Sequence, residues 1–181
     1  MIILIGEGGC GKTTILNELE KRGYTKAINH TTRPKRESEE TLKEYVFLSK
    51  EEFEQMWNEG KLLQRAEFGG EHYGISVASL ADNVACIQIV KSIEDVKQRA
   101  KELGREDAKI VSFYVYVSPE ERTKRMLARG DNINNIQKRI EVDNGKFKEA
   151  KDIVDYVVEN KKDELEQTVD KIIELYTCQT I

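Results

Sequence analysis

The sequence has few cysteines, no long apolar run and no excess of basic residues. Its three cysteines, at positions 10, 86 and 178 of 181 residues, match neither a disulfide framework nor the spacing of a zinc site. The only N-terminal apolar run, residues 1–5, is too short for a signal sequence and far below the roughly 20 residues that span a bilayer. The net charge of −4 argues against a protein that coats nucleic acid, because neutralising phosphates needs a basic excess. We therefore expect a soluble, reduced, cytoplasmic protein with no membrane or nucleic-acid polymer as partner.

The pattern of apolar residues predicts an α/β fold. Hydrophobic residues make up 39% of the chain, which is enough for the core of one domain. The expected strands are residues 2–5, 24–29, 84–90, 110–117 and 156–159. The expected helices are residues 12–22, 92–103, 119–128, 133–150 and 163–176. Because strands and helices alternate, we predict a parallel five-stranded sheet with helices on both faces.

Residues 30–80 break this alternation. A short strand is expected at 45–48, and Ser49 and Glu52 form a capping box that begins a helix. Gly69 and Gly70 then separate two further strand candidates, which predicts a hairpin. These features predict a small β-rich lobe inserted into a single domain whose core is residues 1–29 and 81–181. Outside the lobe, Ser92 and Ser118 are each predicted to cap the helix that follows.

Residues 6–13, with the sequence GEGGCGKT, predict a phosphate-binding loop between the first strand and the first helix. Glycines let several backbone N–H groups turn toward a bound phosphate, and the following helix adds its positive N-terminal end. Lys12 can reach the β- and γ-phosphates, and the hydroxyl of Thr13 can coordinate Mg²⁺ together with phosphates and water. The predicted ATP-binding residues are Gly6, Glu7, Gly8, Gly9, Cys10, Gly11, Lys12, Thr13 and Thr14.

Two other nucleotide-binding classes share part of this pattern. The glycines also fit the dinucleotide fingerprint, but that motif needs an acidic residue after the second strand, and residues 21–36 contain none. Residues 160–163, with the sequence NKKD, resemble the guanine-reading motif of signalling GTPases. Those proteins also need an Asp-x-x-Gly element, which the sequence lacks, so a polar turn before the last helix is the simpler interpretation.

Residues 30–36 (HTTRPKR), Tyr45 and the stretch His72-Tyr73-Gly74 together resemble the guanylate kinase family, and the resemblance extends along nearly the whole chain. It implies a P-loop NTPase fold with a lobe at about residues 30–80 that binds a nucleoside monophosphate (NMP). In that family two arginines and two tyrosines hold the acceptor phosphate, and guanidinium groups do match phosphate oxygens in pairs. The NMP-binding residues that the resemblance implies are Asn29, Arg33, Arg36, Tyr45, Gln64, Tyr73, Ile75 and Gln88.

The resemblance also implies a helical lid at about residues 126–142. The family's lid carries arginines that approach the donor phosphates, and arginines here occur at 125, 129 and 139. Phosphoryl transfer needs alignment of two nucleotides, stabilisation of the moving charge and exclusion of water. The implied activity is transfer of the γ-phosphate of ATP, with Mg²⁺, to GMP or dGMP. The implied catalytic residues are Lys12, Arg33, Arg125, Arg129 and Arg139.

Several residues depart from the family pattern. Gln64 replaces a glutamate that reads guanine, and Ile75 and Asn29 replace hydroxyl residues. An amide offers both an acceptor and donors, so Gln64 could instead pair with a pyrimidine, an adenine or a modified base. Gln88 and Val90 stand where the family carries two aspartates. The alternatives are therefore a kinase for another (deoxy)nucleoside monophosphate, or a catalytically weak guanylate-kinase-like binding module.

Overall fold

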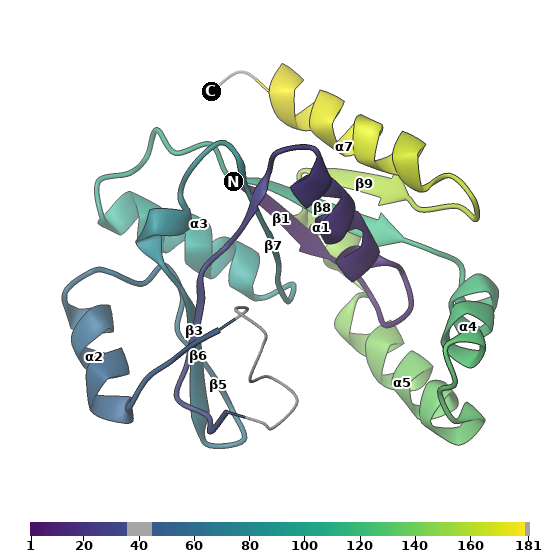
Figure 1. Cartoon of the computed structure of the whole chain (residues 1–181), viewed down its shortest axis with the longest axis horizontal. Helices are drawn as coiled ribbons and strands as arrows, with labels where there is room; N and C mark the ends of the chain where they lie inside the picture. The colour runs from purple at the N-terminus through teal and green to yellow at the C-terminus, as the bar shows by residue number, and fades with distance from the viewer. Residues whose placement is uncertain (36–44, 180–181) are drawn as a thin grey trace.

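The computed structural model describes residues 1–35 and 45–179, which form two sheets and their covering helices (Figure 1). The strands of the larger sheet are β1 (Ile2–Ile5), β2 (Thr25–Lys26), β7 (Val84–Ile87), β8 (Val111–Tyr116) and β9 (Tyr156–Glu159). Their order is β2-β7-β1-β8-β9, and every neighbouring pair is parallel. The predicted parallel five-stranded sheet is confirmed.

Helices cover both faces of this sheet. The helices α1 (Lys12–Lys21) and α7 (Leu165–Cys178) pack on one face, and α3 (Ser92–Glu102) and α6 (Ala150–Ile153) pack on the other. The helices α4 (Pro119–Ala128) and α5 (Ile133–Lys146) extend away from the sheet. Since successive strand residues point to opposite faces, Leu4 packs with Ile15 of α1 and Val169 of α7, whereas Ile3 packs with Ile93 of α3. All four residues of β1 are buried, as expected for a strand covered on both sides.

The inserted segment forms a second, four-stranded sheet. Its order is β4-β3-β6-β5, and it is accompanied by α2 and the short 3-10 helix η2. The bounds are β3 (Asn29–Thr31), β4 (Tyr45–Phe47), α2 (Lys50–Asn58), β5 (Ala66–Phe68), β6 (Glu71–Ile75) and η2 (Val77–Ser79). Figure 1 shows this lobe and the pair α4 and α5 extending from the same side of the larger sheet.

Some expected boundaries differ from the structure. The strand expected at 24–29 is two strands, because the chain leaves the larger sheet after Lys26 and enters the smaller one at Asn29. The helix expected at 133–150 ends at Lys146, and the separate helix α6 begins at Ala150. Among the described residues, the structure contains no helix with the length and apolar character needed to cross a membrane.

The predicted helix caps are confirmed at two of three sites. Ser49 and Glu52 form the reciprocal capping box of α2, and Ser118 Oγ accepts the N–H of Glu121 at the start of α4. The prediction for Ser92 is wrong, since Lys91 is the N-cap residue of α3 and Ser92 is the first helical residue. Its hydroxyl instead accepts a hydrogen bond from the side-chain amide of Gln64, so a tertiary partner replaces the local cap.

Candidate active site

A cleft of about 840 Å³ lies where the phosphate loop, the lobe and α5 meet. Ligands of open parallel sheets bind beyond the carboxyl ends of the strands, at the point where the chain order reverses. Here β1 lies between β7 and β8, and the loop that follows β1 lines the cleft. The lining residues with predicted roles are Gly6, Gly8, Lys12, Thr13, Asn29, Tyr45, Gln64, Tyr73, Ile75, Gln88 and Arg139. The structure therefore brings most of the predicted donor and acceptor residues to one cavity.

The phosphate loop has the backbone geometry that its glycines predict. Gly11, the N-cap residue of α1, has a left-handed φ of 93°, and a Cβ atom there would lie 2.5 Å from Nδ2 of Asn160. The ammonium of Lys12 donates to the carbonyls of Gly6 at 2.6 Å and Glu7 at 3.0 Å. Lys12 therefore folds back along the loop, at the side of the cleft where a phosphate tail would lie.

Asn160 holds the loop from the opposite side. Its Nδ2 atom donates 2.9 Å to the carbonyl of Cys10, and its own carbonyl accepts from Arg125 at 2.9 Å. The Asn160 side chain is buried. Residues 162 and 163 form a turn before α7, as predicted for this polar segment, and Asn160 in addition supports the phosphate loop. The NKKD pattern drew attention to Asn160, but it did not indicate that the side chain binds the carbonyl of Cys10.

The two buried thiols are poor nucleophiles. Burial raises the pKa of Cys10, and the neighbouring Lys12 ammonium only partly offsets this effect. Burial raises the pKa of Cys86 to about 12, although the N-terminal ammonium opposes the shift. Because the thiolate is the reactive form, neither residue is set up for covalent chemistry. Cys10 is a small residue that fits the loop.

The donor set at the cleft suits a magnesium ion that arrives with a nucleotide. The Thr13 hydroxyl and the Gln88 amide both line the cavity and offer hard oxygen ligands. Within residues 1–35 and 45–179, no group of three or more His, Cys, Asp or Glu side chains could hold a metal by itself. These residues fit Mg²⁺, which commonly binds through one or two protein groups, phosphates and water.

The lobe contributes the opposite wall of the cleft. Tyr45 and Tyr73 line it from β4 and β6, and the guanidinium of Arg33 lies over the Tyr45 ring at 5.2 Å and the Phe47 ring at 5.4 Å. Arg33 is thus placed beside a wall residue rather than among the lining residues. Arg36 lies outside the described residues, so its predicted role stays a prediction.

A buried histidine on the same wall was not predicted to face the cleft. His30 lies on β3 with its side chain mostly buried, and it lines the cavity. Burial lowers the pKa of His30, so its imidazole is neutral at pH 7. Only its place in the fold identifies His30 as a lining residue.

The three lid arginines occupy different positions. Arg139 of α5 lines the cleft, and a Cβ atom on Gly8 would lie only 2.3 Å from its Nε atom. Arg125 of α4 pairs with Glu121 at 3.0 Å and with the carbonyl of Asn160. Arg129 forms an exposed ion pair with Asp131 beyond the end of α4. Arg139 thus lies beside Gly8 of the phosphate loop, and Arg125 lies near Gly11, where a Cβ atom would be 3.8 Å from its Nη1 atom.

A buried charge cluster behind the loop was missed from sequence. Arg122 is 1% exposed and pairs with Glu7 at 3.3 Å and Asp143 at 3.2 Å. The Glu7 carboxylate also accepts from the hydroxyl of Tyr114 at 2.7 Å, and burial together with this bond raises the Tyr114 pKa. The side chain of Glu7 therefore belongs to the support of the loop. A possible signal was that Arg122 lies one turn before the buried Met126 of α4, on its inward face.

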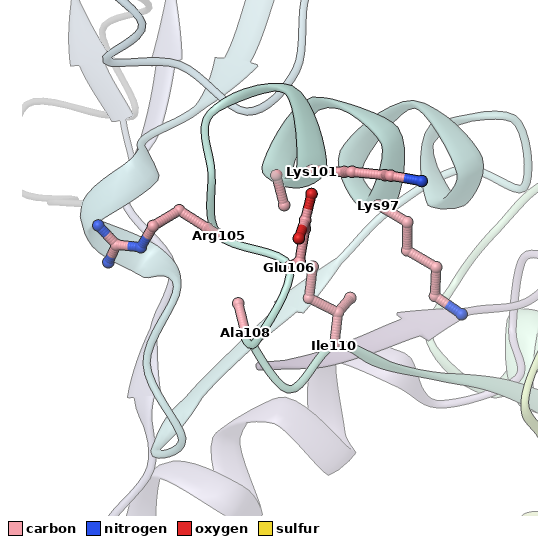
Figure 2. Close-up of a pocket in the computed structure, with 7 residues that line it drawn as sticks. Lys97, Lys101, Arg105, Glu106, Ala108 and Ile110 are labelled. Carbon is pink, nitrogen blue, oxygen red and sulfur yellow. The ribbon is translucent and has the colours of Figure 1, made fainter. Parts of the chain in front are cut away.

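A second hollow, at the C-terminal end of α3, has no converging groups. Lys97, Lys101 and Arg105 line it, and Figure 2 shows their side chains extending in different directions. Lys97 is paired with Asp155 at 3.0 Å. Since the cations do not converge, this hollow is not organised to bind an anion.

Comparisons with known proteins identify the family of the chain. A family model described as guanylate kinase matches residues 1–177. The guanylate kinase of Halalkalibacterium halodurans is 32% identical, over 99% of this chain and 88% of that protein. The guanylate kinase of Bacillus subtilis is 31% identical, over 95% of this chain and 85% of that protein.

Solved structures share the fold. The crystal structure of guanylate kinase from Anaplasma phagocytophilum has a TM-score of 0.64 and 24% identity, and it covers 98% of this chain and 84% of that one. Shikimate kinase from Acinetobacter baumannii has a TM-score of 0.54 and 14% identity over 97% of this chain and 92% of that one. Both resemble the chain in fold, and the match of the family model over residues 1–177 shows that the chain belongs to the guanylate kinase family.

Proposed function

We propose that this protein transfers the γ-phosphate of ATP to GMP or dGMP, which yields ADP and the nucleoside diphosphate. The observation that carries the proposal is the cleft itself, which has the phosphate loop and Arg139 on one wall and Tyr45, Tyr73 and Gln64 on the other. One cavity can therefore hold a triphosphate and a monophosphate together. We also place the protein in the cytoplasm, where ATP is abundant and its three free cysteines would stay reduced.

The donor wall would bind ATP through the loop amides, Lys12 and the start of α1. The positive end of a helix and converging N–H groups favour a phosphate tail. Thr13 would hold Mg²⁺ with phosphate oxygens and water, and the ion would neutralise charge on the transferred group. Glu7 is assigned to the support of the loop, because Arg122 and Tyr114 engage its carboxylate.

The acceptor wall would orient the monophosphate. Tyr45 and Tyr73 can donate phenolic hydrogen bonds, and Arg33, stacked beside Tyr45, supplies positive charge to this wall. Arg36 is proposed as the second arginine of the acceptor site on the strength of the motif alone. Asn29, Gln64, Ile75 and Gln88 would face the nucleoside, since all four line the cleft.

The reaction needs little covalent chemistry from the protein. A phosphate oxygen of the acceptor forms a bond to the γ-phosphorus as the bond from that phosphorus to the bridging oxygen breaks, and ADP leaves. Lys12 and Arg139 would stabilise the charge on the moving phosphoryl group. Arg125 and Arg129 would contribute after the lid closes, because in this structure their guanidinium groups bind Glu121 and Asp131.

A coupled assay of ADP release across the common NMPs and dNMPs tests this proposal. We expect turnover with GMP or dGMP, dependent on Mg²⁺. Preferential turnover with another base would favour a kinase for a different nucleoside monophosphate. The observation that supports this alternative is that the Gln64 amide, rather than a carboxylate, lines the cleft, where it is bound to Ser92. No turnover with any acceptor would contradict the kinase and favour the binding module. Turnover of GTP alone would favour a GTPase.

A further inference from the structure

The backbone N–H and carbonyl of Gly8 connect the phosphate loop to the helices α5 and α4. The N–H of Gly8 donates 2.8 Å to Oδ2 of Asp143 on α5. The carbonyl of Gly8 accepts from Nε of Arg122 on α4 at 2.9 Å. Arg122 also donates to the same Asp143 oxygen at 3.2 Å. These three bonds connect the loop, α4 and α5 in one closed ring.

The ring is shielded from solvent. Arg122 is 1% exposed, the side chain of Asp143 is 13% exposed, and Glu7 pairs with the other side of the guanidinium. Charge-assisted hydrogen bonds are shorter and stronger than neutral ones, and burial strengthens them further. The position of α5 relative to the loop is therefore fixed by buried bonds rather than by a surface contact.

Asp143 lies on the same face of α5 as Arg139. The two residues are four apart, one turn of the helix, so their side chains leave α5 side by side. Both line the cleft, and the Arg139 guanidinium group lies against Gly8. Asp143, which accepts the Gly8 N–H, therefore fixes the position and the rotation of α5 relative to the phosphate loop. Since α5 carries Arg139, it also fixes where Arg139 lies.

We propose that Asp143 is a positioning residue, which docks α5 onto Gly8 and Arg122 and so places Arg139 against the phosphate loop where the donor triphosphate binds. The inference rests on the proposed function, because it assumes ATP as the donor. Asp143 itself need not touch the nucleotide. Its effect on the reaction passes through Arg139.

A double-mutant cycle with Asp143→Ala and Arg139→Ala tests this role. The first readout is the affinity for a non-hydrolysable ATP analogue, measured by calorimetry with Mg²⁺ and without an acceptor. We expect each single variant to weaken binding about tenfold, the size of one lost charged hydrogen bond, and the double variant to be no weaker than Arg139→Ala. The proposal would be overturned if the affinity losses of the two single variants multiply in the double variant, or if the affinity of Asp143→Ala is unchanged.

Two further variants separate positioning from general stability. Asp143→Asn keeps an oxygen acceptor for Gly8 and Arg122, so we expect it to recover most of the lost affinity. Glu141→Ala removes an exposed acidic residue from the same helix and should leave the affinity unchanged. If Asp143→Ala lowers the melting temperature and Asp143→Asn restores the temperature but not the affinity, the role is structural and the proposal is wrong.

The kinetic readout distinguishes this inference from the proposed function. In Asp143→Ala we expect kcat to fall while KM for the acceptor nucleotide stays within about twofold, since the acceptor wall belongs to the lobe. If the wild-type protein turns over no acceptor, the proposed function fails, and the binding cycle still decides the role of Asp143. Arg122 is not varied, because its loss would leave the buried Glu7 and Asp143 unpaired and could unfold the protein.

Discussion

The side-chain amide of Asn160 donates 2.9 Å to the backbone carbonyl of Cys10, and thereby joins the loop after β9 to the phosphate loop after β1. The two residues are 150 positions apart in the chain. Their contact depends on the sheet order, in which β8 separates β1 from β9 and all three strands end on the same side. The last strand therefore contributes directly to the rigidity of the nucleotide site.

We expect Asn160→Ala to destabilise the protein and weaken ATP binding. The change leaves the buried carbonyl of Cys10 without this donor, which costs about 1–3 kcal/mol. Urea unfolding would measure the loss of stability, and KM for ATP should rise more than KM for the acceptor. Lys162→Ala, an exposed change two residues away, is the control and should alter neither quantity. Equal rises in both KM values would contradict a role confined to the donor wall.

We expect Lys12→Met to abolish most turnover while the fold is retained. The Lys12 ammonium lies against the carbonyls of Gly6 and Glu7, where it can meet the charge that develops on the transferred group. Removing one preorganised group of this kind lowers kcat about 100-fold or more. The coupled assay measures turnover, and circular dichroism checks the fold. Lys21→Met, at the exposed end of α1, should behave like the wild type. Full activity in Lys12→Met would refute the role of the loop.

Much of the fold could be predicted because its signals are local. The run at β8 is apolar enough to indicate a strand covered on both faces, and the caps at Ser49 and Ser118 lie within three residues of their partners. The spacing of glycines in residues 6–13 predicts the backbone geometry of the phosphate loop directly. For the same reason the break between β2 and β3 was missed, since neighbouring residues do not reveal that the chain changes sheets.

The parts of the site that sequence could not supply depend on distant partners. Ser92 resembles a helix cap by its position, but its hydroxyl accepts a hydrogen bond from the cleft residue Gln64. Arg122 resembles a solvated helix residue until Glu7 and Asp143 are brought to it from 115 positions before and 21 after. Such contacts are set by the topology of the sheet and the crossing of α4 and α5, which no local pattern specifies.

We expect Gln64→Glu to shift the base preference toward guanine. The Gln64 amide nitrogen is bound to Ser92 Oγ, so a carboxylate there would offer an acceptor to the guanine N1–H and exocyclic amine while Ser92 donates to its other oxygen. A charged hydrogen bond in this cleft would favour GMP by about tenfold in kcat/KM relative to other acceptors. The substrate panel measures this ratio.

Ser92→Ala is the matched control for that prediction. It removes the hydroxyl that holds the Gln64 amide nitrogen and leaves the amide free to turn its acceptor or its donors toward the base. We expect a weaker base preference than in the wild type. An unchanged preference in both variants would remove Gln64 from the base-reading residues.

We expect Asp155→Asn to lower stability in a pH-dependent way. Burial by itself would raise the pKa of Asp155, but hydrogen bonds from Ser112 and the ammonium of Lys97 outweigh it and hold this pKa below its ordinary value of 3.8. A carboxylate with a depressed pKa stabilises the folded state above its unfolded pKa, and this contribution is lost as the pH falls through the folded value. Urea unfolding should therefore find the variant about 1 kcal/mol less stable at pH 7, with the two proteins converging below pH 3.8. Asp152→Asn, an exposed change on α6, should follow the wild-type curve throughout. If the difference in unfolding free energy between the wild type and Asp155→Asn stays constant down to acid pH, then packing, and not the charge on Asp155, joins β8 to the start of β9.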